Sequence, residues 1–284
     1  MIDIILDTLL DTVKLIPFLF VTYLLMELIE HKTGEKAKAA ISKAGSFGPV
    51  IGSLLGAFPQ CGFSASASGL YAGGVVSAGT LIAVFLATSD EMLPVCISEH
   101  VSAGVIAKIL INKVVLGILI GFTVDIVLKI LKKDNSKKDI HSLCQNDDCH
   151  CEEGSVLRSA LHHTLHITVF IFIIVFVMNL IIGFVGEERL GRAFVNIPVV
   201  GCAVSALIGL IPNCAASVVI TELYLQGIIS TGCMMSGLLA GSGLGLLILF
   251  RINKNLRQNA AILLTVYFSS VLIGIIFEVL KISF

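Results

Sequence analysis

The chain has 284 residues, of which 56% are hydrophobic and only 14% are charged, and its mean hydropathy is +0.98. A soluble domain carries about 25% charged residues, so this composition excludes a soluble globular protein. The apolar runs approach the roughly 20 residues of a bilayer span, which predicts a multi-pass membrane protein. The net charge of −1 gives no support for nucleic-acid binding.

The first half of the chain is predicted to hold three membrane crossings and one re-entrant hairpin. The crossings are residues 15–30, 75–97 and 103–131, and the hairpin is residues 47–73. Pro59 and Gly62 interrupt the hairpin near its centre, and non-helical backbone at that depth is tolerated only where it lines a cavity or is buried in protein. Lysines cluster at 32–43 and 129–138. The positive-inside rule puts both clusters in the cytoplasm and the N-terminus outside.

The second half repeats this order after a polar loop at 134–154, which is expected to be cytoplasmic. Residues 156–186, 229–250 and 260–282 are predicted crossings, and 195–226 is the second hairpin. Arg251 to Arg257 form a third cytoplasmic basic segment, which leaves the C-terminus outside. An alternative counts each hairpin as one broken crossing, which would make the two halves parallel.

An internal repeat underlies this order. Pro59 and Pro212 lie 153 positions apart, and the same offset relates many further pairs. Examples are Gln60 and Asn213, Cys61 and Cys214, Ser64 and Ser217, Tyr71 and Tyr224, Ser77 and Ser230, and Asp125 and Glu278. The predicted fold is therefore an all-α integral membrane protein with ten helical segments. It consists of two inverted repeats, 1–133 and 155–284, each with three transmembrane helices and one hairpin.

Inverted repeats with paired broken helices indicate a secondary transporter whose substrate site lies near the middle of the membrane. Both hairpin tips contain an amide, a cysteine and a serine, and the two tips are expected to face each other. The alternative is that proline, glycine and small polar residues only allow close helix packing. The candidate substrate-binding residues are Gln60, Cys61, Ser64, Ser89, Asp90, Glu91, Asn213, Cys214, Ser217 and Ser242.

Asp90 and Glu91 lie in an otherwise apolar segment, where an ionisable residue is a functional candidate by default. The second repeat has Gly243 and Leu244 at these positions. A symmetric packing role does not explain that difference. Asp90 is the first choice for the group that binds a cation or a proton, and Glu91 the second.

The loop at 134–154 offers a second, weaker candidate for metal binding. Its potential ligands are His141, Cys144, Cys149, His150 and Cys151. The spacing matches no standard zinc finger, so the loop is interpreted as one that collects metal rather than one built around a structural ion.

Two segments resemble a known family of membrane proteins. Gly56-Ala57-Phe58-Pro59-Gln60-Cys61-Gly62-Phe63-Ser64 and the run from Gly79 to Pro94 resemble a family of bacterial and archaeal ten-segment permeases. These permeases are described as heavy-metal exporters, with members named as arsenic efflux proteins or manganese transporters, and they are distantly similar to arsenic permeases. The resemblance implies export of a metal or metalloid ion.

The expected function is therefore secondary-active export of a metal ion across the plasma membrane by proton or cation exchange. Oxygen ligands outnumber sulfur at the predicted site, which favours a divalent ion such as manganese. The alternatives are export of arsenite or an organoarsenical, of copper or zinc, or of an organic anion. An intramembrane enzyme that uses Cys61 or His163 is disfavoured because no paired base is evident. The expected partners are the lipid bilayer, the transported ion and a second copy in a homodimer, with no nucleic acid and no cofactor.

Overall fold

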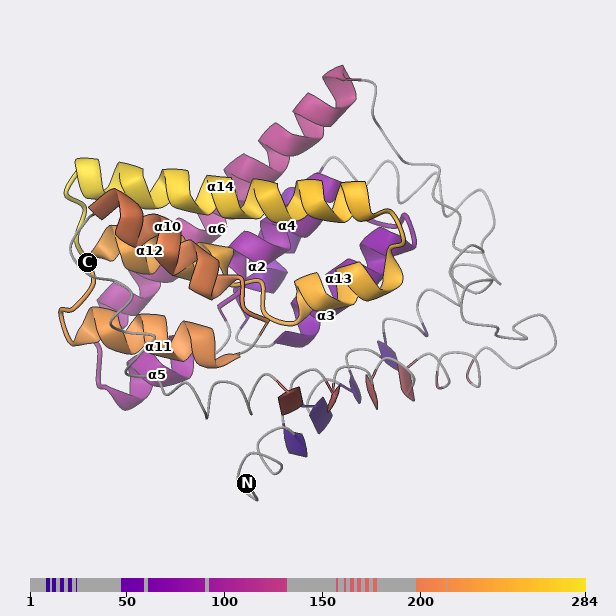
Figure 1. Cartoon of the computed structure of the whole chain (residues 1–284), viewed down its shortest axis with the longest axis horizontal. Helices are drawn as coiled ribbons and strands as arrows, with labels where there is room; N and C mark the ends of the chain where they lie inside the picture. Colours follow the sequence, from indigo (N-terminus) through magenta and orange to yellow (C-terminus); the bar gives the residue numbers. More distant parts are fainter. Residues whose placement is uncertain are drawn as a thin grey trace.

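The computed structural model describes residues 47–58, 61–89, 92–131, 198–212 and 214–284, with scattered positions in 9–24 and 157–177. These residues form helices, with no strand among them (Figure 1). The first helix set comprises α2 (Gly48–Gly56), α3 (Cys61–Ala72), α4 (Ala78–Ala87), α5 (Met92–Ser98) and α6 (Ala103–Ile130). The second helix set comprises α10 (Pro198–Gly209), α11 (Cys214–Leu225), α12 (Thr231–Ala240), α13 (Gly245–Ile252) and α14 (Leu256–Val279). The prediction of an all-helical protein is confirmed.

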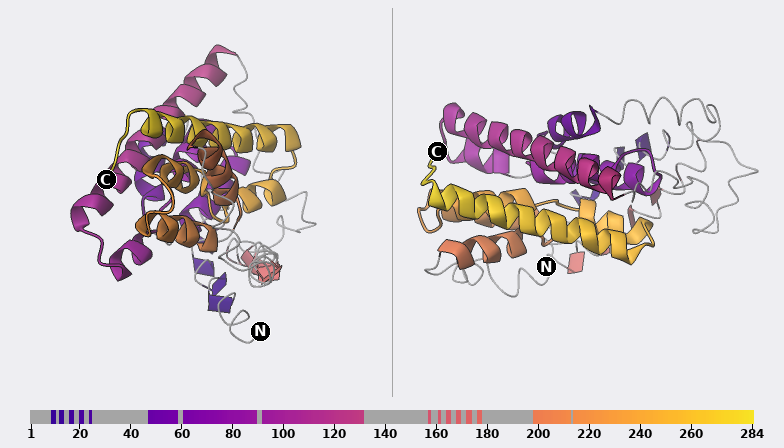
Figure 2. Two further views of the ribbon diagram at one scale, coloured as in Figure 1. Left: turned by 60° about the vertical axis from the view of Figure 1, so that its left-hand side comes forward. Right: turned by 90° about the horizontal axis from the view of Figure 1, so that it is seen from above.

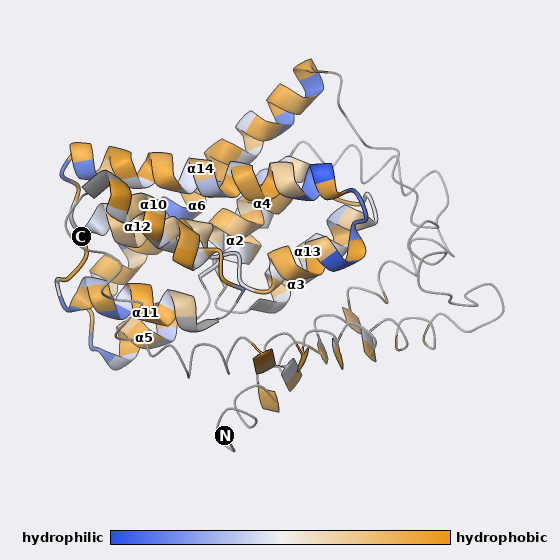
Figure 3. Ribbon diagram, in the orientation of Figure 1, coloured by the Kyte–Doolittle hydropathy of each residue, from blue (hydrophilic) through white to orange (hydrophobic). Residues whose placement is uncertain are grey.

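Four stretches of the described chain are long and apolar enough to cross a membrane. They are Ala78–Ser98, Ala103–Ile130, Thr231–Ile252 and Leu256–Val279. The first and third are mostly buried inside the protein, whereas α6 and α14 are mostly exposed. Leu119 and Leu272 are examples of exposed apolar side chains on α6 and α14, and both helices are coloured as mostly hydrophobic in Figure 3. A face of this kind is suited to lipid, so the protein is a multi-pass membrane protein.

The helices of the second set occur 153 positions after equivalent helices of the first set. α11 and α12 begin and end 153 positions after α3 and α4, and α14 begins 153 positions after α6. The packing within each set is also equivalent. In the first set α4 contacts α2 and α6, and in the second set α12 contacts α10 and α14. Seen from above, α6 and α14 lie in two adjacent layers, one from each set (Figure 2, right).

The turns that end α3 and α11 share one hydrogen-bonding pattern. The amides of Val75 and Ile228 donate to the carbonyl oxygens of Leu70 and Leu223, each at 2.8–2.9 Å. Gly74 and Gly227 have φ of 73° and 72°. This is the Schellman helix end, whose left-handed position glycine adopts without steric cost.

A serine and a carboxylate then begin the next helix in each set. Ser77 Oγ accepts the amide of Thr80 at 3.0 Å and donates to Asp125 Oδ2 at 2.7 Å. Ser230 likewise accepts the amide of Cys233 and donates to Glu278. A serine at this position caps helix amides that would otherwise lack a partner. The carboxylate near the end of each long helix therefore joins it to the start of α4 or α12.

Glycines bring these helices into close backbone contact. A Cβ on Gly79 would lie 2.1 Å from the carbonyl oxygen of Gly121, and a Cβ on Gly232 would lie 2.5 Å from that of Gly274. Small residues at such contacts are the usual means of packing membrane helices, because apolar burial gives little gain within lipid.

The two sets meet through α3 against α13 and α5 against α11, and also where α4 contacts α12 and α14. Ser68 Oγ of α3 donates to the carbonyl oxygen of Gly245 in α13 at 2.7 Å, and α11 packs against α5. The sequence predicts that Ser89, Asp90, Glu91 and Pro94 interrupt the crossing 75–97. In the structure α4 ends at Ala87, and Thr88 and Ser89 follow it outside the helix. The predicted crossing 229–250 corresponds to the apolar stretch Thr231–Ile252, in which Gly241 to Leu244 separate α12 from α13. The glycines at 241 and 243 account for the break, since Gly243 has φ of 54°.

Candidate functional site

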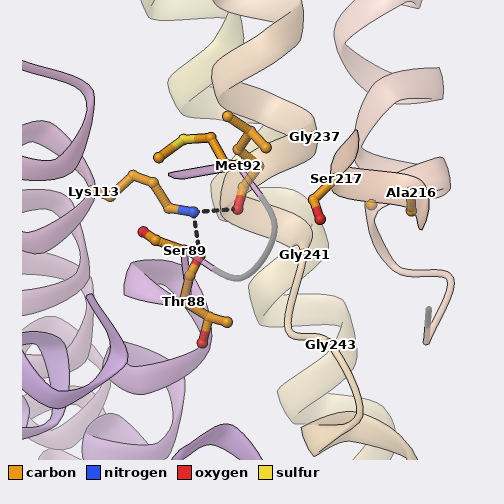
Figure 4. A pocket seen from close by; sticks show the side chains of 11 residues that line it. Thr88, Ser89, Met92, Lys113, Ala216, Ser217, Gly237, Gly241 and Gly243 are labelled. Atoms are coloured by element: carbon orange, nitrogen blue, oxygen red, sulfur yellow. Dashed lines mark hydrogen bonds between the residues drawn. The ribbon is translucent and has the colours of Figure 1, made fainter. Parts of the chain in front are cut away.

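A small pocket lies between the two helix sets (Figure 4). Its walls come from the end of α4, from α5 and α6, and from α10, α11 and α12. The lining residues are Thr88, Ser89, Met92, Lys113, Gly209, Ala216, Ser217, Gly237, Leu238, Gly241 and Gly243. Both breaks in the helices, after α4 and after α12, therefore open onto the same pocket.

Among the described lining residues, the charged one is Lys113. Its side chain is 1% exposed, and its ammonium donates hydrogen bonds to the carbonyl oxygens of Thr88 and Leu238, the latter at 2.9 Å. Thr88 ends α4 and Leu238 lies in the last turn of α12. Carbonyls in the last turn lack partners within their helix and carry a partial negative charge. Lys113 thus satisfies the ends of two helices, one from each set (Figure 4).

Lys113 lies deep in the membrane-spanning part of α6. It follows Ala103 by ten residues, which corresponds to about 15 Å along a helix. The hydrocarbon core of a bilayer is about 30 Å thick, so the ammonium lies near the middle of the span. A charged group at this depth is costly, and for this reason marks a functional site by default.

Ser89 and Ser217, two of the predicted substrate-binding residues, line this pocket together. Ser89 is 1% exposed, and its hydroxyl donates to the carbonyl oxygen of Ala87 at 3.0 Å. Ser217 belongs to α11 and lies across the pocket from Lys113 (Figure 4). The two hydroxyls come from different helix sets.

Two other predicted serines are not among the lining residues. Ser64 is fully buried in α3, where a Cβ on Gly245 would lie 2.9 Å from it. Ser242 is 1% exposed and lies in the break after α12, between the lining residues Gly241 and Gly243. Its hydroxyl has no hydrogen-bond partner among the described residues.

The remaining predicted residues fall outside what the structure describes. Cys61 and Cys214 begin α3 and α11, but the description does not extend to their side chains. Outside the described residues lie Gln60, Asp90, Glu91 and Asn213, and the loop residues His141, Cys144, Cys149, His150 and Cys151.

Comparison with known proteins identifies the family. The profile of a family described as "Putative, 10TM heavy-metal exporter" matches residues 1–156 and 130–280. The chain belongs to this family. Among curated proteins and among solved structures, no match was found. Membership in an exporter family supports metal efflux rather than an enzymatic reaction.

Lys113 is not among the site residues predicted from the sequence. The residue interrupts an apolar helix of 28 residues, and the rule that selects Asp90 also selects it. The position 153 residues later is Val266, so the ammonium has no counterpart in the second helix set. The asymmetry noted for Asp90 and Glu91 therefore extends to Lys113.

The pocket of the exporter suits an ion. Helix ends that present carbonyl oxygens, together with the hydroxyls of Ser89 and Ser217, are oxygen ligands for a cation. The ammonium of Lys113 bonds to these carbonyls, so a cargo cation would compete with it for them. An anion would instead be attracted to the ammonium itself.

Proposed function

We propose that the protein is a secondary-active transporter that exports a metal ion through the pocket between its two helix sets. The observation that carries this proposal is the bridge from Lys113 to the ends of α4 and α12. Lys113 acts as a tethered cation. It holds the two helix ends together in the empty carrier, and a bound metal ion displaces it from their carbonyl oxygens.

The proposed architecture is two inverted repeats, 1–133 and 155–284, with re-entrant hairpins at 47–73 and 195–226. The recurrence of helices and contacts at one offset supports it. Repeats of this kind allow alternating access by movement of one unit against the other. The protein is proposed to lie in the plasma membrane, with both termini outside and the loop 134–154 in the cytoplasm.

The proposed cargo is a divalent ion such as manganese, exported in exchange for a proton or another cation. The potential ligand atoms described for this pocket are the hydroxyl oxygens of Ser89 and Ser217 and the carbonyl oxygens of Thr88 and Leu238, and Met92 supplies a sulfur. Oxygen donors suit manganese better than thiophilic ions. Asp90 and Glu91 are proposed to supply the negative charge that a divalent ion needs, and Gln60, Ser64, Asn213, Ser217, Ser89 and Ser242 further oxygens.

A second candidate function follows from the charge of Lys113. A buried ammonium is also the group expected in a carrier for an anion, such as an organic acid or a metalloid oxyanion. The two functions predict opposite effects when this charge is removed.

The test is transport by Lys113→Met and Lys113→Arg in inside-out vesicles, with Lys108→Met as the matched control. Lys108 lies five residues earlier in α6 and is exposed. Uptake of Mn²⁺ and of an organic anion is measured with and without a proton gradient.

For a cation carrier, Lys113→Met frees the carbonyls of Thr88 and Leu238. One hydrogen bond to a charged group contributes about 1.5–3 kcal/mol. The KM for Mn²⁺ should therefore fall about tenfold, while the maximal rate falls because the empty carrier no longer resets. The KM and the maximal rate of Lys113→Arg should lie between those of wild type and Lys113→Met. Both values for Lys108→Met should match wild type. If Lys113→Met loses affinity for the anion and leaves Mn²⁺ uptake unaffected, the anion carrier is correct instead.

A further inference from the structure

A second group of potential metal ligands lies away from the pocket, in the second helix set. It consists of Cys202 of α10, Cys233 of α12 and Glu278 of α14. One ligand atom from each residue lies within 4.8 Å of the other two. Both cysteines are buried and neither is in a disulfide, and Glu278 is half-buried. We propose that Cys202, Cys233 and Glu278 bind a thiophilic divalent cation of the zinc class.

The spacing of the two sulfur atoms agrees with a shared ion. Cys202 Sγ and Cys233 Sγ are 3.8 Å apart. Two thiolates at about 2.3 Å from a tetrahedral Zn²⁺ are separated by about 3.8 Å. The sulfurs are therefore already at the separation that such an ion requires, so binding needs no rearrangement of α10 against α12.

The first helix set shows that the cysteines are not needed for packing. Pro49 and Thr80 occupy the positions equivalent to Cys202 and Cys233, and Asp125 the position equivalent to Glu278. Both oxygens of Asp125 are used, since Oδ1 accepts the amide of Gly79 at 2.8 Å and Oδ2 accepts the hydroxyl of Ser77. The helix junction is thus built there without sulfur.

Glu278 is engaged differently. Its hydrogen bond among the described residues comes from Ser230 to Oε1, which leaves Oε2 as a ligand. A serine that holds a ligating carboxylate in this way orients it toward the ion. The longer side chain of glutamate also carries its carboxylate farther from α14 than aspartate would.

Two glycines, which have no side chain, provide the space that the sulfur atoms occupy. A Cβ on Gly201 would lie 2.8 Å from Cys233 Sγ, and a Cβ on Gly274 would lie 3.2 Å from Cys202 Sγ. Alanine at either position would push a thiol out of place. The cluster is therefore a fitted arrangement of three ligand side chains and the glycines behind them.

The place of the cluster is one end of the bundle. Ser230 and Cys233 lie at the start of α12, and Glu278 is one residue before the end of α14. Three ligands leave the fourth position of a tetrahedral ion open, as in zinc sites that exchange a ligand. Binding displaces the protons of two thiols, which leave as the ion enters. This cluster would then be a transient binding point at that end of the bundle, separate from the pocket.

The test is Cd²⁺ binding to the reduced full-length protein in detergent micelles, with Cys144, Cys149 and Cys151 replaced by serine. Thiolate-to-cadmium absorption in the ultraviolet and X-ray absorption spectroscopy report the number of sulfur ligands. Cys61 and Cys214 remain in every sample, so only differences between variants are compared. Cys96→Ser is the matched control, because Cys96 is a buried cysteine of α5.

Cys202→Ser and Cys233→Ser should each remove one equivalent of bound Cd²⁺, and Cys96→Ser should remove none. Cys233→Thr, which copies the first helix set, should give the same loss and an unchanged thermal midpoint. Ser230→Ala, which removes the orienting hydroxyl, should weaken binding by about 10–100-fold. The proposal is overturned if Cys202→Ser and Cys233→Ser keep the full stoichiometry, or if air oxidation of the pair to a disulfide is the only reaction observed. Neither outcome affects the pocket, whose test depends on Lys113.

Discussion

The ammonium of Lys113 donates a hydrogen bond to the carbonyl oxygen of Leu238 at 2.9 Å, across 125 positions of sequence. A buried charge within an apolar span is tolerated because it meets backbone oxygens at helix ends, where no helical amide competes for them. This bond and the bond to Thr88 connect α6 to helices of both sets.

Gly79→Ala is expected to destabilise the protein, because the new Cβ would lie 2.1 Å from the carbonyl oxygen of Gly121. Overpacking of this kind costs about 1–3 kcal/mol. Gly104→Ala is the control, since nothing lies within 4 Å of its Cβ and alanine is the better helix former. The midpoint of thermal unfolding in detergent should fall for Gly79→Ala and not for Gly104→Ala. Equal midpoints would contradict the close approach of α4 and α6.

Asp125→Asn is expected to weaken the junction between α6 and α4. The carboxylate accepts two hydrogen bonds, from Ser77 and from the amide of Gly79, and asparagine keeps one acceptor oxygen. A hydrogen bond to a charged group contributes about 1.5–3 kcal/mol, so the free energy of unfolding should fall by about that much. Thr123→Ala, an exposed change two residues away, should stay within about 0.5 kcal/mol of wild type. Chemical denaturation in mixed micelles measures both, and no difference between them would refute the capping role.

Asp90→Asn is expected to abolish metal export driven by a proton gradient, because it keeps the shape of the side chain and removes its charge. Gln60→Ala and Asn213→Ala remove neutral ligands and should chiefly weaken affinity. Export assays in vesicles with an imposed gradient separate the two effects. Export by Asp90→Asn at near wild-type rate and affinity would reject the assignment, and Glu91→Gln would be the next variant to test.

The inverted arrangement predicts opposite accessibility for the two hairpins. Single cysteines introduced as Ser46→Cys and Ala193→Cys, in a background without other cysteines, should be labelled by an impermeant thiol reagent from the cytoplasm and from outside, respectively. A cysteine placed in the loop 134–154 serves as the cytoplasmic reference. Labelling of both positions from one side would mean that the repeats are parallel.

Much of the order of the helices could be predicted because the internal repeat provides two equivalent sequence segments for each helix. Gly74 and Gly227 mark equivalent helix ends, and Ser77 and Ser230 mark equivalent helix starts. The break after α12 was not predictable in this way. Its residues carry no charge and lie in an apolar run, whereas the equivalent break after α4 is marked by Asp90 and Glu91.

Less of the candidate site than of the fold could be predicted from the sequence. Ser89 and Ser217 could be named because they follow the repeated motifs, and the structure brings them into one pocket. The partners of Lys113 are backbone oxygens, 25 and 125 positions away, and backbone atoms leave no residue-type signal in a sequence. Cys202 and Cys233 are likewise 31 positions apart, and their approach depends on how α10 packs against α12.

The glycine contacts between α4 and α6, and between α12 and α14, limit how the protein can move. Because the backbones touch at Gly79 and Gly121, and again at Gly232 and Gly274, neither helix of a pair can slide along the other without collision. Each pair, fixed also by its serine and carboxylate, must then move as one rigid body. Any opening of the pocket therefore depends on the contacts between the two helix sets. Among the described residues, these contacts include the hydrogen bonds from Ser68 to Gly245 and from Lys113 to Leu238, and the packing of α3 against α13 and of α4 against α14.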